Sequence, residues 1–163
     1  MSPGKPHLLR VLSSPVPASV VDRLAPVDLC HPTVCREPFT AEGWLFELKH
    51  DGFRAFVRKS GSDVHLLSRW GRSMAHAFPE VIEALGEVPG DVVLDAELVV
   101  ADEQGRSDFE ELRRRALLQR PRLIDMAARR TPASLIVFDV LCASGEDFAS
   151  FLCRSASSGC NAT

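Results

Sequence analysis

An Asp-Gly pair at positions 51 and 52 separates two segments in which apolar and polar side chains alternate. The segments are residues 44–49 and residues 53–58, and a period of two is typical of β-strands. Asp-Gly is a strong signal for a hairpin because both positions of the tight turn require a positive φ. The sequence therefore predicts that these two segments pair as an antiparallel hairpin.

Three charged side chains flank this turn. Glu47 and Lys49 are two residues apart on one expected strand, so their side chains share a face of the sheet. Arg54 follows the turn on the other strand. The hairpin would hold a carboxylate, an amine and a guanidinium near one another. The alternative is an exposed hairpin whose mixed charges only face solvent.

The segment 47–54 resembles the E-x-K-x-D-G-x-R motif of the ATP-dependent DNA ligases, which are covalent nucleotidyltransferases like RNA ligases and mRNA capping enzymes. Residues 68–71 are similar to the next ligase motif, S-R-x-G, and residues 95–97 to D-G-E, with an alanine at the glycine position. Phe138 ends an apolar run, as does the family's adenine-stacking aromatic residue. The resemblance covers about residues 44–141.

This resemblance implies an α+β fold, namely an antiparallel β-sheet core with flanking helices, as in the ATP-grasp-like adenylation domain of DNA ligases. It also implies a reaction with ATP. The amine of Lys49 would attack the α-phosphate to form a lysyl-AMP intermediate. AMP would then pass to the 5′-phosphate at a nick in double-stranded DNA, and the neighbouring 3′-hydroxyl would displace AMP and seal the strand.

The resemblance also implies roles for the other site residues. Glu47 would accept a hydrogen bond from the adenine amino group, which favours ATP over GTP. Arg54 and Arg69 would orient the ribose and the phosphates. Glu97 would hold a ribose hydroxyl or a Mg²⁺ (or Mn²⁺) ion, and Phe138 would stack on adenine.

The nucleophile and the acids can also be considered from their chemistry alone. An amine attacks only when neutral, and a free lysine has a pKa of about 10.4. We expect the positive charge of Arg54 and partial burial to lower the pKa of Lys49.

The strongly apolar segment 92–100 contains Asp95 and Glu97, which are costly to bury without partners, so this segment is a candidate site. The alternative is that these acids lie at a partly solvated edge of the sheet and belong to no site.

The remaining periodicity predicts the other elements. Further strands are expected at residues 63–68 and 135–141, and helices at 77–85, at 107–118 and at 122–130. The consecutive arginines 113–115 are interpreted as a solvated helix face.

Composition limits the class of protein. The 163 residues suit one domain. Because the net charge is −3, contact with DNA would have to come from local basic patches or from parts of a larger protein that this chain lacks. No apolar run is long enough for a membrane span or a signal peptide, so we expect a cytoplasmic protein. The five cysteines include no C-x-x-C pair, which argues against a disulfide framework or a zinc site. Cys30, His31 and Cys35 could form half of a metal site.

Three regions are expected along the chain. Residues 1–40 form a proline-rich segment, residues 41–148 a partial adenylation domain, and residues 149–163 an atypical, disordered tail. The later ligase motifs and the OB-fold domain have no counterpart after about Phe148, so we expect a truncated chain that is incomplete for catalysis. Two alternatives stay open: a non-catalytic nucleotide-binding remnant, or an RNA ligase or capping-type nucleotidyltransferase.

Overall fold

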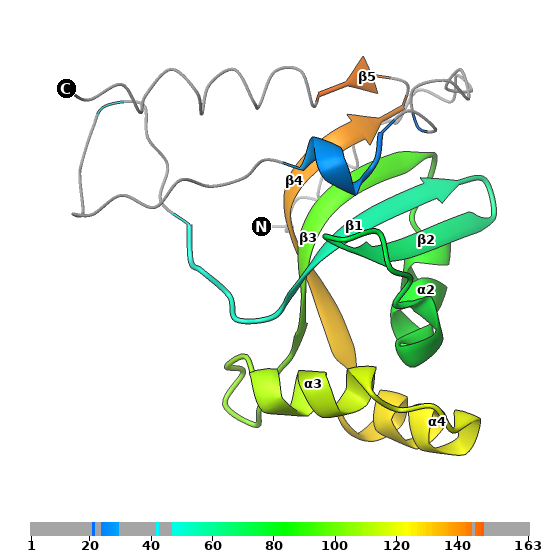
Figure 1. Ribbon diagram of the computed structural model, residues 1–163. Helices are drawn as coiled ribbons and strands as arrows, with labels where there is room; N and C mark the ends of the chain where they lie inside the picture. The colour runs from blue at the N-terminus through cyan, green and yellow to red at the C-terminus, as the bar shows by residue number, and fades with distance from the viewer. Residues whose placement is uncertain (1–20, 22–23, 30–41, 43–46, 145, 149–163) are drawn as a thin grey trace, which may run out of the picture.

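The computed structural model describes residues 21, 24–29, 42, 47–144 and 146–148 of the chain. These residues form a five-stranded antiparallel sheet in the order β2-β1-β3-β4-β5, accompanied by helices (Figure 1). The strands are β1 (Phe53–Ser60), β2 (Asp63–Ser68), β3 (Val92–Val100), β4 (Ala133–Ala143) and β5 (Glu146–Asp147). The predicted α+β fold with an antiparallel core is confirmed.

The helices begin where the sequence provides helix-start signals. They are α2 (Pro79–Gly86), α3 (Phe109–Ala116) and α4 (Pro121–Arg130), with short 3₁₀ helices η1 (Pro26–Asp28) and η2 (Ala75–Ala77). Pro79 and Pro121 occupy first-turn positions, where proline is tolerated. The Asp108 carboxylate caps α3 by accepting a 2.9 Å hydrogen bond from the Glu111 amide. The predicted helices are confirmed, with ends shifted by at most two residues.

One face of the sheet packs against helices α2 and α3 and contains the main hydrophobic core, and α4 contacts α2. Alternate strand residues supply one side of this core and the helices, with the segment before α2, supply the other. The fully buried side chains include Val57, Leu66 and Leu98 from strands, and Phe78 and Leu112 from the helical side. The strand residues that alternate with these core residues, including Arg54, Asp95 and Glu97, therefore lie on the opposite face of the sheet.

The opposite face of the sheet is divided into an apolar end and a polar end. At the apolar end, Phe56 of β1 and Val93 of β3 pack with Val21 and Leu29 from the N-terminal part of the chain. At the other end, Arg54 of β1 pairs in register with Glu97 of β3. Side chains of paired residues share a face, so β1 and β3 project charged groups together at this end.

The predicted hairpin of residues 44–49 with residues 53–58 is wrong. The structure describes residues 47–50 as irregular chain, and β1 pairs on its two sides with β2 and β3. Neither Asp51 nor Gly52 has a positive φ, which an Asp-Gly hairpin turn requires. The hairpin that does form joins β1 to β2 through a turn with Gly61 at φ 57°.

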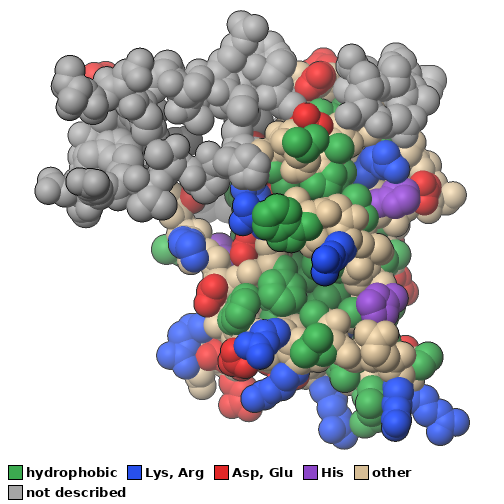
Figure 2. Space-filling model, viewed as in Figure 1, with side chains coloured by type: hydrophobic (Ala, Val, Ile, Leu, Met, Phe, Trp, Pro, Cys, Tyr) green, Lys and Arg blue, Asp and Glu red, His purple; other side chains and the backbone are tan. Residues whose placement is uncertain are grey.

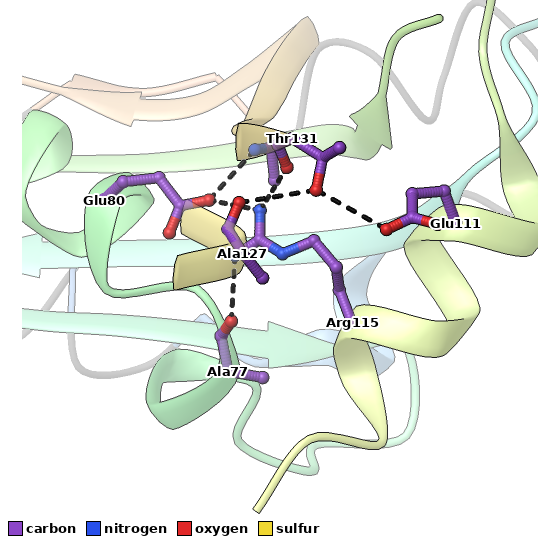
Figure 3. A network of polar contacts seen from close by, with 7 residues as sticks. Ala77, Glu80, Glu111, Arg115, Ala127 and Thr131 are labelled. Carbon is purple, nitrogen blue, oxygen red and sulfur yellow. Dashed lines mark hydrogen bonds and ion pairs between the residues drawn. The ribbon is translucent and has the colours of Figure 1, made fainter. Parts of the chain in front are cut away.

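Arg115 is buried, so the interpretation of residues 113–115 as a wholly solvated face is wrong for this residue. Its guanidinium donates to Glu80 Oε1 at 2.5 Å, to the Thr131 carbonyl at 2.8 Å and to the Ala77 carbonyl at 3.1 Å (Figure 3). Glu80 Oε1 also accepts a 2.9 Å hydrogen bond from the Ala133 amide. This network ties α3 to α2 and to the start of β4, beneath the main core.

Some sequence predictions fall on residues outside the described part of the chain. They include Trp44, the candidate half metal site at Cys30, His31 and Cys35, most of the segment 1–40 and the tail 149–163. In the part that is described, none of the helices is long and apolar enough to cross a membrane.

Candidate functional site

The polar end of the second sheet face is organised by an ion pair between neighbouring strands. Arg54 Nε donates to Asp95 Oδ1 at 3.0 Å, and Arg54 Nη2 donates to Asp95 Oδ2 at 2.5 Å. The Asp95 side chain is only 2% exposed and that of Arg54 19%. A two-point contact of this kind is the favoured geometry for a guanidinium and a carboxylate. The acid in the apolar strand therefore has the partner that its burial requires.

Phe138 of β4 lies beside this ion pair. The Arg54 guanidinium carbon is 5.8 Å from the centroid of the Phe138 ring, a cation–π distance. The Phe138 side chain is 41% exposed, so the ring is not part of the closed core. It remains accessible to a planar ligand. Its assignment as the adenine-stacking residue stays a prediction.

Glu97 contacts residues 47–52, which precede β1 and are called the Lys49 segment below. Burial raises the pKa of the Glu97 carboxyl; a hydrogen bond from the Gly52 amide and the positive charges of Lys49 and Arg54 oppose this rise without cancelling it. The positive charge of Lys49 therefore favours the ionised form of Glu97. The carboxylate and the Lys49 segment thus meet at one place.

Gly52 is needed for this close approach. A Cβ atom at Gly52 would overlap the Leu98 carbonyl oxygen, and it would come within 2.9 Å of side-chain carbons of Glu97 and Val99. Only glycine lets the chain lie this close to β3. The Asp-Gly pair thus positions the Lys49 segment against the sheet instead of turning a hairpin.

Lys49 and Glu47 themselves are exposed. The expected partial burial of the nucleophile is therefore not found. Glu47 acts electrostatically on a different carboxyl, Asp139. The Lys49 segment consequently approaches the polar end with both of its charged side chains, while those side chains remain open to solvent.

Asp139 is a site residue that the sequence reasoning did not single out. Burial raises the pKa of its carboxyl, and the negative charges of Asp95 and Glu47 raise it further. The Val140 amide and Arg54 act in the opposite direction. Asp139 is the register partner of Asp95. The signal that could have found it is an acid in an apolar strand, the same signal that indicated Asp95 and Glu97.

Arg69 follows β2, whose last residue, Ser68, pairs with Ala55. It is therefore at the end of the sheet where β1 begins. The structure does not bring Arg69 into the cluster around Arg54; its guanidinium instead lies 4.7 Å from the centroid of the Trp70 ring. Its predicted role with ribose or phosphate is not tested by these contacts.

A metal ion would find few protein ligands in the described part of the chain. No group of three or more His, Cys, Asp or Glu side chains there is arranged to hold one. Glu97 offers one carboxylate, and Mg²⁺ in nucleotide sites is commonly held by one or two carboxylates together with substrate phosphates. The residues present therefore fit a metal shared with a nucleotide, and they do not fit a site built from protein ligands alone.

Comparison with known proteins gives the family. The family model described as "ATP dependent DNA ligase domain" matches residues 30–154, which is most of the chain. This chain belongs to the ATP-dependent DNA ligase domain family. The match includes the Lys49 segment and every strand of the sheet.

Bacterial ligases are among the proteins that this chain resembles. The bifunctional non-homologous end joining protein LigD of Bacillus subtilis is 35% identical over 124 residues, covering 71% of this chain and 20% of that protein. DNA ligase C of Mycobacterium tuberculosis is 40% identical over 104 residues, covering 63% of this chain and 28% of the ligase. The chain thus spans less than a third of either relative. A solved mycobacterial DNA ligase D complexed with ATP and MES is 30% identical, with a TM-score of 0.48, over 62% of this chain and 30% of that one.

Proposed function

We propose that the chain carries the nucleotide-transfer site of an ATP-dependent DNA ligase, in residues 41–148, between a proline-rich segment (1–40) and a tail (149–163). The observation that carries this proposal is the meeting of the Lys49 segment with Glu97 at the polar end of the sheet face opposite helices α2 and α3. Arg54, Asp95 and Phe138 are gathered at the same end. Membership of the ligase domain family supports it.

In the first step, the neutral amine of Lys49 forms a bond to the α-phosphorus of ATP. The bond from that phosphorus to the β-phosphate oxygen breaks, and pyrophosphate leaves. The amine loses its proton to solvent, which the exposure of Lys49 permits. The product is AMP joined to Lys49 through a nitrogen–phosphorus bond.

The other residues position the nucleotide in this proposal. Phe138 stacks on adenine, Glu47 accepts a hydrogen bond from its amino group, and Arg54 and Arg69 bind ribose and phosphate oxygens. Glu97 holds a ribose hydroxyl or a divalent cation. Mg²⁺ or Mn²⁺, held by Glu97 and the ATP phosphates, would neutralise charge on the transferring phosphate.

In the later steps, a 5′-phosphate oxygen at a nick in double-stranded DNA attacks the phosphorus of AMP, and the bond to Lys49 breaks. The adjacent 3′-hydroxyl then attacks the activated 5′-phosphate, and AMP leaves. The Bacillus subtilis relative is named as an end-joining protein, so we propose DNA repair as the process. Because the chain spans a fifth of that relative, we expect nick sealing to require protein parts beyond these residues.

The test is incubation with Mg²⁺ and α-labelled ATP, followed by a denaturing gel. The proposal expects an acid-labile label on the wild-type chain that is absent from Lys49→Ala. Lys49→Arg is the matched control, because it keeps the positive charge and lacks the nucleophilic amine. Label from GTP as readily as from ATP would favour a capping-type enzyme.

A second candidate function is nucleotide binding without transfer, which the exposure of Lys49 favours. Equilibrium binding of ATP separates the two. ATP binding with no covalent label on any form of the chain would support this second function, whereas a label that depends on Lys49 would exclude it.

A further inference from the structure

We propose that the turn of residues 68–72 binds an unpaired base of single-stranded DNA by stacking that base on Trp70. The choice of DNA rests on the proposed function. The choice of residues rests on the geometry of this turn, which the proposed nucleotide chemistry does not use apart from Arg69.

The turn is held in shape by hydrogen bonds at its base. The Ser68 amide donates to the Arg72 carbonyl at 2.8 Å, and the Gly71 amide donates to the Ser68 carbonyl at 2.8 Å. Ser68 Oγ accepts from the amides of Trp70 at 3.4 Å and Arg72 at 3.2 Å. Gly71 supplies the positive φ of 74° that the turn needs. A preorganised turn loses little conformational freedom when it binds a ligand.

Trp70 is presented to solvent by this turn. The residue is 76% exposed, so the ring is accessible to a ligand. The Arg69 guanidinium lies 4.7 Å from the ring centroid and steadies the ring through a cation–π contact. An exposed aromatic ring beside arginines is the arrangement on which nucleic-acid bases stack.

The charges around Trp70 suit a phosphate backbone. Arg69 and Arg72 are both exposed, and within the described residues neither forms an ion pair. The chain has a net charge of −3, so phosphates are attracted only where basic side chains gather. Arg69 beside the ring and Arg72 two residues further along the turn provide such a place.

The turn lies at the end of the sheet where the Lys49 segment enters β1. Ser68 pairs with Ala55, the residue after Arg54. A base stacked on Trp70 would therefore lie at the same end of the sheet as the proposed nucleophile. In a duplex nearly all base faces are covered by their neighbours, so a stacking site of this kind selects unpaired bases.

Tryptophan fluorescence tests this inference directly. The chain contains no tyrosine and two tryptophans, Trp44 and Trp70, so a Trp44→Phe background leaves Trp70 as the only fluorophore of these two types. This protein is titrated, without ATP, with a short 5′-phosphorylated single strand and with a blunt duplex of the same sequence. The inference expects saturable quenching by the single strand and weaker quenching by the duplex at equal concentration.

A second measurement does not depend on that background. Anisotropy of a labelled single strand should show that Trp70→Ala in the otherwise native chain weakens binding about 5-fold to 100-fold, with Trp70→Phe retaining part of the affinity. Arg129→Ala is the charge control, because exposed arginines also gather on α3 and α4 along the lower edge of Figure 2. Combined with Trp44→Phe, it should leave the Trp70 quenching amplitude at saturation unchanged.

Any of four results would overturn the inference: no binding of the single strand at low salt, equal quenching by single strand and duplex, equal quenching by polyglutamate, or unchanged affinity in Trp70→Ala. Labelling of Lys49 by ATP needs no DNA, so it can succeed while this inference fails, and it can fail while Trp70 still binds DNA.

Discussion

Arg54 of β1 holds the buried carboxylate of Asp95 of β3 through two hydrogen bonds, at 3.0 and 2.5 Å. The same guanidinium lies 5.8 Å from the ring centroid of Phe138 on β4. One side chain therefore connects three strands at the polar end of the sheet. The same pair both stabilises the fold and fixes the position of a proposed nucleotide-binding group.

Replacing Arg54 by alanine should destabilise the chain. Asp95 would remain buried without its partner, and breaking such a pair typically costs about 3–5 kcal/mol. Urea denaturation would measure the loss in the free energy of unfolding. Arg54→Gln combined with Asp95→Asn is the control, because it removes both charges and should recover part of the loss. A single Arg54→Ala variant as stable as wild type would contradict this prediction.

Gly52→Ala should displace the Lys49 segment from β3, since the new methyl group would overlap the Leu98 carbonyl. Overpacking of this kind costs about 1–3 kcal/mol in folding free energy. Covalent labelling by ATP should also fall. Gly86→Ala is the matched control, because a Cβ there meets nothing within 4 Å. Equal effects of the two substitutions on stability and labelling would argue against the close-approach role of Gly52.

The Glu80–Arg115 network should make stability depend on pH in the acid range. Burial raises the pKa of Glu80, but hydrogen bonds from Arg115 and from the Ala133 amide outweigh this effect. The pKa of Glu80 in the folded chain therefore lies below its ordinary value of 4.5. The unfolded chain therefore binds more protons than the folded chain between the two pKa values, so stability falls as pH drops below about 4.5.

Glu80→Gln tests this pH dependence. The variant should be less stable than wild type at neutral pH, because Arg115 would remain buried without a charged partner. Its loss of stability on acidification should be shallower. Urea denaturation of both proteins from neutral pH down through the acid range would measure the difference. Parallel stability curves for the two proteins would contradict the assignment to Glu80.

Asp139→Asn should stabilise the chain at neutral pH. Burial and the charges of Asp95 and Glu47 raise the pKa of Asp139 above its ordinary value of 3.8, so ionisation opposes folding above the folded-state pKa. The gain should disappear below about pH 3.8, where both states are protonated. Thermal melts of both proteins at neutral and acid pH would test this, and Asp125→Asn on the exposed face of α4 is the control. A loss of stability at neutral pH would show the opposite sign.

Much of the fold follows from sequence periodicity. Residues 63–68 form β2 as predicted, and residues 92–100 form β3, because each pattern matches one strand in a half-buried or fully buried setting. The hairpin prediction failed because local alternation cannot reveal which strands become neighbours. β1 takes β2 and β3 as partners, and β3 is about thirty residues away along the chain.

The site was only partly predictable. Acids in apolar strands signal a buried partner or a site, which holds for Asp95 and applies equally to Asp139. The burial of Arg115 could not be read from its neighbours, since its partner Glu80 lies 35 residues earlier. The exposure of Lys49 likewise depends on how the segment meets β3 through Gly52, a contact that no local pattern shows.

The central claim is that Lys49 becomes covalently joined to AMP. The most direct test is mass spectrometry of the intact chain and of its peptides after incubation with ATP and Mg²⁺. The account predicts one added AMP group, located on the peptide that contains Lys49 and absent from Lys49→Arg. An AMP group on Lys59, which is buried and donates to the Gly90 carbonyl, or on any other residue would contradict it, as would an unmodified chain that binds ATP.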